Sequence, residues 1–548
     1  MYIKMQRREV IINVSKGFVF VLLFLMILLH SQEVLTPKWE ENSRPRSTFN
    51  GPDAMRSPEN IDVFFIGTSQ IYCGISPMTI YEQNHIATYN FASPVQTIQT
   101  SYALAGRIIN RYAPKVIVLD AGSLFFGVGQ SSARYVLDSL PLDVDKLRMI
   151  SDYRDLNGED PMISLPLPLY NYHTRWSKLS RDDFRVLPPF GFHYAAGQYL
   201  MGASNGTLWP EDRIQETLTE QLRLNEQGKT SIQENGELWT GAVTSKLFSA
   251  EANESNVETL KKIKELCDRN NVEFLLIKVP SRGAPNQSAT WSSYKSNIAR
   301  EIAQDCGVEF LDLLYDVDIG IDNNTDWWGG GFHMSVSGAE KVSKFLGDYL
   351  SDHYSLSECE DEDYNRAYDV YSHMRTISAL QSIDNFQSYL EMLKKHDTEW
   401  TVFISGNNAF SVYFNEDDAA AFTVFNSKLI GSGTQNDSYV AIIDNGEMCY
   451  EALSNRLIDY YTQHNGLDVS LGSVSQLNDD YQGHPGVRIN GIEYSPATYG
   501  LNIVVWDKIA NRVIDCVCFN TAAEWHYAYR NITFVNQLYF DYETAYCF

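Results

Sequence analysis

Four short apolar runs constrain the fold of this chain most strongly, because each is typical of a strand buried on both faces. They are "IDVFFIG" at 61–67, "APKVIVLDAG" at 113–122, "VEFLLIKVPS" at 272–281 and "VEFLDL" at 308–313. Segments with the apolar spacing of a helix alternate with these runs, at 97–109, 256–271 and 296–307 and again after His333. This alternation predicts an α/β domain, a doubly wound parallel sheet with helices on both faces.

At 548 residues the chain is too long for a single hydrophobic core, so more than one domain is expected. The polar, aromatic segment 128–250 interrupts the alternation and is interpreted as a cap inserted into the α/β domain, which spans 61–355. Short strand-like runs dominate from about residue 375, which predicts a β-rich α+β domain over 375–548. We place the boundary in the acidic stretch "SECEDEDYN", near residue 360.

The N-terminus carries a targeting segment. The run "GFVFVLLFLMILL" at 17–29 is extended backward to about twenty residues by the segment from Val10, which is the length that a membrane span needs. Because Lys and Arg precede this run, the positive-inside rule predicts a cytoplasmic tail at 1–9, a signal anchor at 10–30 and a linker at 31–60. No small-residue cleavage site follows, which favours a retained anchor over a cleaved signal peptide. The bulk of the chain is therefore expected outside the cytoplasm, at the cell membrane.

Charge and cysteine content exclude several functions. The 43 Lys and Arg against 69 Asp and Glu give a net charge of −26, and such a chain repels the phosphates of nucleic acid. The eight cysteines form no CxxC pair and no mixed Cys/His spacing, so no metal site is expected. No cofactor is expected either.

One serine and one histidine are candidates for a catalytic pair. Ser69 comes directly after the first predicted strand, and His333 follows the last one by a short glycine-rich loop. Because the carboxyl ends of parallel strands share one edge of the sheet, both side chains are expected at that edge. Asp326, seven residues before His333, is close enough in sequence to orient the imidazole. The alternative is that the glycines form an ordinary turn and that His333 packs in the core.

These motifs resemble those of a known superfamily. "VFFIGTSQIYCGISP" and "FHMSVSGAEKVSKFLGDYL" resemble the first and last blocks of the SGNH (GDSL-like) hydrolases. Further segments, including "YNFASPVQTIQTSYAL" and "YHTRWSKLSRDDF", resemble its membrane-anchored branch, which works beside membrane-bound O-acyltransferases in teichoic-acid D-alanylation or exopolysaccharide acetylation. The resemblance implies a flavodoxin-like sheet, Ser69 as nucleophile, His333 as base and Asp326 as the residue that holds it.

The chain departs from the pattern of the superfamily. The superfamily usually has Asp three residues before its His, where this chain has Gly330, and the usual oxyanion-hole Asn is absent from "LDAGS". Candidate oxyanion or substrate-binding residues are Gly67, Gln70, Gln96, His173 and Arg175. For His173 and Arg175 the alternative is an ion pair that fixes the inserted segment.

The C-terminal part has its own resemblance. "WTVFISGNNAFSVYFNEDD" and "INGIEYSPATYGLNIVVWD", with the sequence around them, resemble the interleukin-like EMT inducer domain, a lectin-like module. The two resemblances together imply acyl transfer or ester hydrolysis on a cell-envelope polysaccharide, beside a membrane-bound O-acyltransferase as partner. Two alternatives stay open: a catalytically degenerate polysaccharide-binding partner of such an acyltransferase, and a structural envelope protein.

Overall fold

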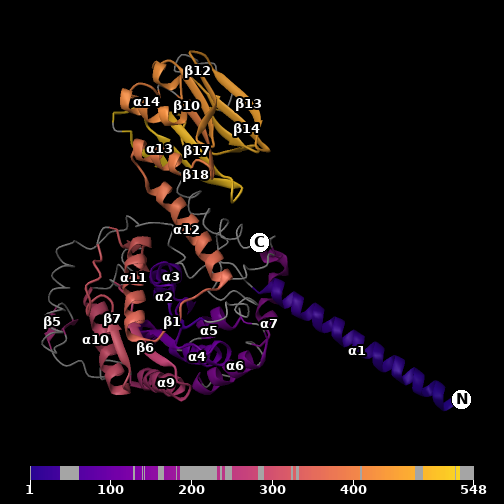
Figure 1. Ribbon diagram of the computed structural model, residues 1–548. Coiled ribbons are helices and arrows are strands. Elements are labelled where there is room, and N and C mark those ends of the chain that lie inside the picture. Colours follow the sequence, from indigo (N-terminus) through magenta and orange to yellow (C-terminus); the bar gives the residue numbers. More distant parts are fainter. Residues whose placement is uncertain are drawn as a thin grey trace. The chain divides into compact units, whose positions relative to one another are not determined.

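The computed structural model contains two compact units, one ending at Tyr368 and the other beginning at Asp369. The structure describes residues 2–36, 61–126, 130–138, 140, 142–157, 166–179, 182–184, 231–234, 237–240, 250–281, 289–322, 325–328, 333–407, 410–474, 485–524 and 526–530. Figure 1 shows the elements of both units.

A five-stranded parallel sheet organises the first unit. Its strands are β1 (Val63–Gly67), β2 (Thr88–Ala92), β3 (Val116–Asp120), β6 (Glu273–Lys278) and β7 (Glu309–Asp312). They are hydrogen bonded in the order β2-β1-β3-β6-β7, and every pair is parallel. This is the strand order of flavodoxin-like sheets. The expected parallel α/β sheet is confirmed, and β2 is a strand that the four apolar runs did not include.

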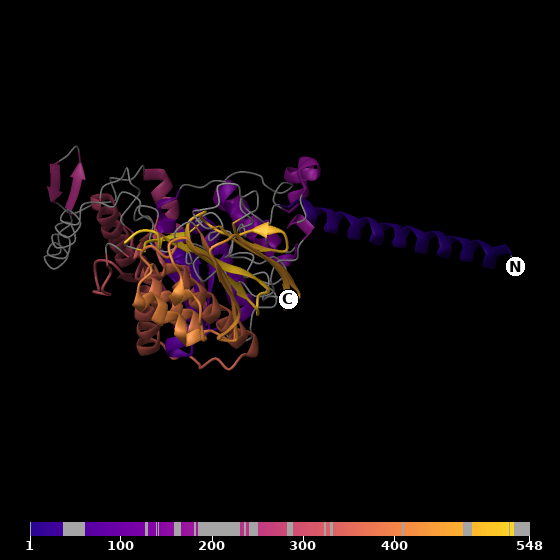
Figure 2. The same ribbon diagram turned by 90° about the horizontal axis from the view of Figure 1, so that it is seen from above.

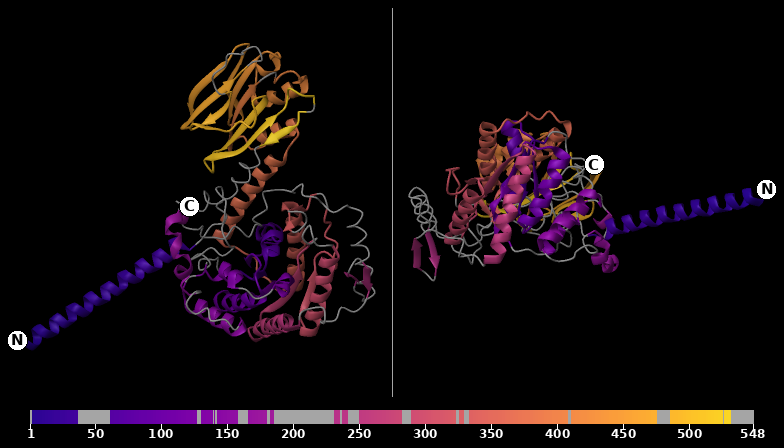
Figure 3. Two further views of the ribbon diagram at one scale, coloured as in Figure 1. Left: turned by 180° about the vertical axis from the view of Figure 1, so that it is seen from behind. Right: turned by 90° about the horizontal axis from the view of Figure 1, so that it is seen from below.

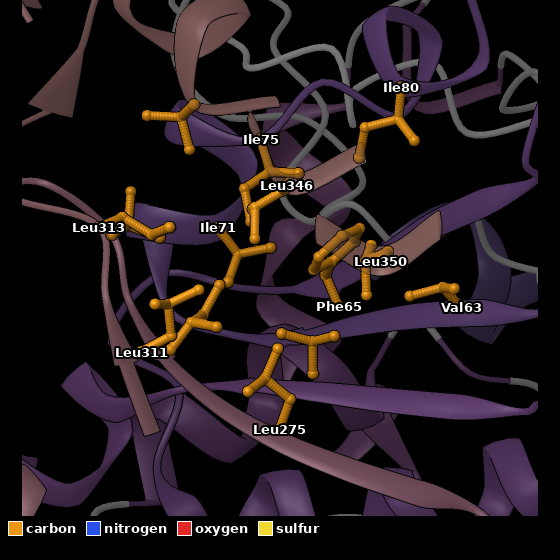
Figure 4. Packing of buried hydrophobic residues seen from close by; sticks show 14 of the residues in the cluster. Val63, Phe65, Ile71, Ile75, Ile80, Leu275, Leu311, Leu313, Leu346 and Leu350 are labelled. Atoms are coloured by element: carbon orange, nitrogen blue, oxygen red, sulfur yellow. The ribbon is translucent and has the colours of Figure 1, made fainter. Parts of the chain in front are cut away.

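Helices cover both faces of this sheet. The helices are α2 (Ser69–Gly74), α3 (Pro77–Asn84), α4 (Ile98–Tyr112), α9 (Ala250–Arg269), α10 (Ala289–Cys306) and α11 (Val336–His353). Ile71, Leu346 and Leu350 from α2 and α11 pack on Val63 and Phe65 of β1 (Figure 4). On the other face α4 contacts β1 and α9, and α9 contacts β6. Because successive strand residues point to opposite faces, strands buried by helices on both sides, such as β1 and β3, are mainly apolar.

Few elements of the inserted segment 128–250 lie within the described residues. They are α5 (Gln130–Leu137), α6 (Val144–Asn157), α7 (Pro168–Tyr172), the 3-10 helices η3 (His173–Lys178) and η4 (Asp182–Phe184), and the strands β4 (Ser231–Glu234) and β5 (Glu237–Thr240). Helix α6 packs on α4 of the core domain, and Arg107 of α4 pairs with Asp143, just before α6, at 3.1 Å. The segment is thus tied to the helical layer.

The N-terminal helix α1 (Tyr2–Leu35) contains one stretch, Asn13–Gln32, that is long and apolar enough to cross a membrane. Its mean hydropathy is 2.1, and none of it is buried inside the protein. The helix runs five residues beyond the predicted end of the span at residue 30. Residues 37–60 of the predicted linker lie outside the described residues.

The second unit is β-rich, as expected. Its larger sheet has the order β12-β11-β10-β17-β18-β19, and its smaller sheet has the order β13-β14-β15-β16. The bounds are β10 (Trp400–Asn407), β11 (Ser438–Asp444), β12 (Glu447–Ser454), β13 (Ile458–His464), β14 (Leu467–Ser473), β15 (Gly486–Ile489), β16 (Ile492–Glu493), β17 (Gly500–Asp507), β18 (Arg512–Phe519) and β19 (Ala528–Arg530). Phe403 and Val440 of the larger sheet pack on Leu471 and Val487 of the smaller one. Figures 2 and 3 show this unit in orange and yellow.

Three α-helices lie in the described part of this region. Helix α12 (Glu362–Ser382) begins inside the acidic stretch where a boundary was predicted, and the division between the units falls within this helix. Helices α13 (Phe386–Lys395) and α14 (Glu416–Phe422) contact each other beside the larger sheet. Tyr389 of α13 donates a hydrogen bond to the buried Asp515 of β18 at 2.8 Å.

Two helical glycines should respond oppositely to the same substitution. In Gly338→Ala the new Cβ meets the carbonyl oxygen of Asp326, so we expect a loss of about 1–3 kcal/mol in the free energy of unfolding. In Gly106→Ala the nearest atom is 3.9 Å away, so helix propensity should give a gain of about 0.5–1 kcal/mol. Thermal unfolding of the full chain measures both. A stabilising Gly338→Ala would show that the 326 loop does not pack tightly on α11.

Candidate functional site

Ser69 is positioned by a tight strand-to-helix turn. Strand β1 ends at Gly67, Thr68 is the N-cap of α2, and Ser69 is the first residue of that helix. The Thr68 hydroxyl accepts a hydrogen bond from the backbone N–H of Gln70 at 3.2 Å. Gly67 has a φ of +154°, and a side chain there would overlap the Cβ of Asp120. Glycine is therefore required where β1 passes β3.

Asp120, at the end of β3, holds this turn. Its Oδ2 accepts hydrogen bonds from the Thr68 hydroxyl at 2.5 Å and from the Thr68 N–H at 3.3 Å, and its Oδ1 accepts one from Gly122 N–H at 2.9 Å. Complete burial raises the pKa of Asp120, and these hydrogen bonds oppose that shift. Asp120 is not among the site residues predicted from the sequence. An Asp that ends an otherwise apolar strand at the carboxyl edge of the sheet was the available signal.

His333 is positioned by a short hairpin. The strands β8 (Trp327–Trp328) and β9 (His333–Met334) pair antiparallel, with Trp328 opposite His333. Strand β9 contacts α2, the helix that begins with Ser69. Met334 and Trp327, one from each strand of the hairpin, are buried in the hydrophobic core. The three glycines at 329–331 lie outside the described residues.

The structure brings Ser69 and His333 together. Nε2 of His333 lies 2.9 Å from Oγ of Ser69, within hydrogen-bond distance, although 264 residues separate them. The imidazole is largely buried, and this burial lowers its pKa from the usual 6.5 to about 4. A neutral imidazole is the form that accepts a proton, so at neutral pH the pair has the correct protonation state for activating a hydroxyl.

Asp326 lies in the same loop, but its carboxylate binds other groups. Oδ2 accepts hydrogen bonds from Asp322 N–H at 2.6 Å and from the Lys341 ammonium at 2.7 Å, and Oδ1 accepts one from the Thr325 hydroxyl at 3.0 Å. Within the described ranges it makes no hydrogen bond to His333. These contacts differ from the predicted orienting role, because the carboxylate closes the base of the hairpin and pairs it with α11.

The residues predicted to line an oxyanion site make local hydrogen bonds. The Gly67 carbonyl accepts a hydrogen bond from Ser93 N–H at 3.1 Å. The backbone N–H of Gln70 is bound by the N-cap. The buried amide of Gln96 accepts from the Ser93 hydroxyl and donates to that of Ser101, both at 3.0 Å. The Gln96 side chain therefore shapes the loop before α4.

His173 and Arg175 lie on η3 in the inserted segment. Arg175 donates hydrogen bonds to the carbonyl of Leu35, the last residue of α1, at 2.6 Å and to Asp183 Oδ1 at 2.7 Å. Nδ1 of His173 lies 2.8 Å from the carbonyl oxygen of Tyr170. For Arg175 these contacts match the alternative of an ion pair that fixes the inserted segment, although its partner is Asp183.

Two lysines add positive charge at the carboxyl edge of the sheet. Nζ of Lys278, the last residue of β6, lies 3.8 Å from Oδ2 of the buried Asp312. Lys295 of α10 is mostly buried, and this burial is the main cause that lowers its pKa. Repulsion from Lys278 lowers the pKa further, while attraction to Asp120 opposes the shift. These lysines were also missed in the sequence, where Lys278 appears only as the end of an apolar strand. Their charges compensate the carboxylates at this edge.

The arrangement as a whole provides a hydroxyl next to a neutral imidazole, at the edge of a parallel sheet where sites form in open α/β folds. Proton transfer from Ser69 to His333 needs no rearrangement, since the two atoms are already at hydrogen-bond distance. The buried ring is a weak base. It ionises less readily than an exposed histidine, so the proton transfer is expected to be slow.

Comparisons with known proteins give limited information. No family model matches the sequence, and the search of curated proteins found no match. Among solved structures, the chain is similar to a protein from Bacteroides fragilis described as an acylhydrolase, with 9% identity, a TM-score of 0.24, and coverage of 59% of this chain and 93% of the other. It is also similar to a GDSL-like lipase from Bacteroides thetaiotaomicron, with 9% identity, a TM-score of 0.24, and coverage of 53% and 87%.

Substitution of Asp326 should affect stability more than reactivity. In Asp326→Asn a buried carboxylate with three donors is lost, so we expect the free energy of unfolding to fall by about 1–3 kcal/mol. We expect Lys341→Met to lower it in the same direction but by less, because Lys341 is partly exposed. Ser69 labelling by a fluorophosphonate, measured where the variants are folded, should fall less than about 10-fold. A loss near 10⁴-fold, as for the orienting Asp of a catalytic triad, would restore the orienting role.

The pH dependence of Ser69 labelling should follow the ionisation of His333. Because protonated imidazole cannot accept the serine proton, we expect the labelling rate to be constant between pH 8 and pH 6 and to fall by half near pH 4. Intrinsic fluorescence at each pH provides the folding control. In the unfolded chain His333 has the ordinary histidine pKa of 6.5, so between pH 6.5 and pH 4 the unfolded state binds more protons than the folded state. The free energy of unfolding should therefore decrease as the pH is lowered from 6.5 to 4. A half-maximal rate near pH 6.5 would show that His333 is not buried in the active protein.

Proposed function

We propose that this chain is a membrane-anchored serine esterase or acyltransferase that acts on an acylated polysaccharide of the cell envelope. The observation that carries the proposal is the 2.9 Å separation of Ser69 Oγ and His333 Nε2. The substrate class and a membrane-bound O-acyltransferase as partner rest on the resemblance of the Ser69 and His333 segments to the membrane-anchored SGNH branch.

The proposed reaction has two steps. Ser69 Oγ attacks the ester carbonyl while His333 Nε2 takes its proton, and the same proton then passes to the departing alcohol as the acyl-enzyme forms. In the second step His333 takes a proton from water or from a sugar hydroxyl. The oxygen of that acceptor attacks the acyl carbon and releases Ser69, which recovers its proton. Hydrolysis and transfer differ only in the acceptor.

Two observations favour the alternative, a polysaccharide-binding partner with a degenerate serine site. Burial holds the pKa of His333 near 4, and a base this weak removes a hydroxyl proton inefficiently. The second unit also has a groove of about 560 Å³ on the smaller sheet, lined by the exposed Tyr461 together with Gln463, Asp468 and Arg488. An aromatic ring beside polar groups is a surface on which sugars can stack and hydrogen bond.

Turnover of a simple ester distinguishes the two functions. With full-length protein in detergent and p-nitrophenyl acetate, we expect slow release of nitrophenolate that Ser69→Ala abolishes and that His333→Ala lowers by about 10²–10⁴-fold. Ser382→Ala, at an exposed serine near the end of α12, is the matched control and should leave the rate unchanged. Equal rates in the wild type and in Ser69→Ala would exclude Ser69 as the nucleophile and favour the binding function.

A further inference from the structure

The described part of the inserted segment exposes a group of large apolar side chains. Leu167 is 37% exposed, Tyr170 64%, Trp176 72% and Phe184 61%. We call these four residues the aromatic patch. They belong to or adjoin α7, η3 and η4, three consecutive short elements. Single exposed apolar residues are common on protein surfaces, but several large ones on adjoining elements favour a contact surface.

The aromatic patch is attached to the carboxyl end of α1. Helices α7, η3 and η4 all contact α1, and the structure shows α7 beside the end of that helix (Figures 1 and 3). Arg175 of η3 connects this element to α1 and to η4. Its guanidinium donates hydrogen bonds to the Leu35 carbonyl at the end of α1 and to Asp183 on η4. Val34 and Thr36, on either side of Leu35, are buried. The patch is therefore fixed relative to the end of the apolar helix.

The depth of the patch follows from the length of the helix. The apolar stretch ends at Gln32, and Leu35 is three residues later, about 4.5 Å further along the helix axis at 1.5 Å per residue. The headgroup layer on each side of the hydrocarbon core is roughly 5–8 Å thick. The elements that bind Leu35 thus lie at the level of the lipid headgroups whenever Asn13–Gln32 spans the bilayer.

The chemistry of the patch fits that layer. Trp and Tyr concentrate at membrane–water interfaces, because their rings are apolar and their N–H and O–H groups reach water. Exposed Lys178 lies on the same 3-10 helix as Trp176, and basic side chains favour anionic headgroups. The chain as a whole carries a net charge of −26. A general electrostatic attraction to lipid is therefore excluded, so contact depends on a local apolar and basic surface.

We propose that the aromatic patch inserts into the headgroup region of the bilayer, so that the first unit has a second membrane contact beside its transmembrane helix. The occupant of this surface is lipid. The contact is independent of the chemistry at Ser69 and requires only that α1 spans the membrane. Two contacts, the helix and the patch, restrict rotation of the α/β domain about the axis of α1, which a single helical tether leaves free.

Depth-dependent fluorescence quenching tests the proposal. The full chain is reconstituted into protein-free vesicles of phosphatidylcholine and phosphatidylglycerol that contain lipids with a nitroxide either near the headgroup or near the end of the acyl chain. The chain has ten tryptophans, and the difference between the wild type and Trp176→Phe isolates the signal of Trp176 from that of the other nine. We expect Trp176 to be quenched strongly by the headgroup nitroxide and weakly by the chain-end nitroxide.

A second pair of variants separates insertion from nonspecific contact. Tyr170→Ser/Phe184→Ser should reduce quenching of Trp176 at least twofold, because the remaining ring loses its neighbours in the lipid. Tyr529→Ser/Ile492→Ser changes two exposed side chains of the second unit and should leave the quenching unchanged. Thermal unfolding confirms that both variants are folded. No quenching of Trp176 in these vesicles would overturn the proposal, and a patch that binds a protein partner would give that result.

Discussion

The buried carboxylate of Asp120 is the interaction on which the candidate site depends. It binds the hydroxyl and the N–H of Thr68 and the N–H of Gly122, so it fixes the turns that follow two neighbouring strands. Gly67 permits the close approach, since any side chain there would overlap Asp120. Ser69 is the next residue after Thr68, so its position is set by a contact between β1 and β3 and not by the short helix α2 alone. A buried acid is costly, and here three donors and the nearby Lys278 compensate it.

The position of His333 is set from the opposite direction, by a hairpin whose base is closed by Asp326, Thr325 and Ser335. The Ser335 N–H donates a hydrogen bond to the Asp326 carbonyl, and the Ser335 hydroxyl donates one to the Thr325 carbonyl. Ser335 is also the N-cap of α11. The first residue of α2 and the loop before α11 therefore meet because both helices pack on one face of the sheet. The cost of this arrangement is burial of the imidazole, which keeps it neutral but weakens it as a base. A site of this kind matches slow chemistry or a binding function better than rapid turnover.

Arg175, a candidate for substrate binding in the sequence, has a structural role in the folded protein. Its pattern in "YHTRWSK" was compatible with substrate binding, but its guanidinium joins the end of α1 to η4. These hydrogen bonds attach the inserted segment to the end of the N-terminal helix. The exposed rings beside it form the surface that we propose to enter the bilayer when Asn13–Gln32 of α1 spans it.

The layers of this protein can be predicted from the amino-acid sequence alone. Apolar runs ending in Gly67, Asp120 and Lys278 predict buried parallel strands, and the twenty-residue span predicts a helix that can cross a membrane, because periodicity and length are local properties. The sequence also placed Ser69 and His333 at one edge of the sheet, since parallel strands share their carboxyl ends. Contacts between distant parts of the chain set the 2.9 Å separation of the two side chains. The same kind of contact pairs Asp326 with Lys341 and lets Asp120 support the turn. The helix that begins inside the acidic stretch near residue 360 was also not predicted. Hydrogen-bond partners and burial depend on residues far apart in the chain, so no spacing along the sequence specifies them.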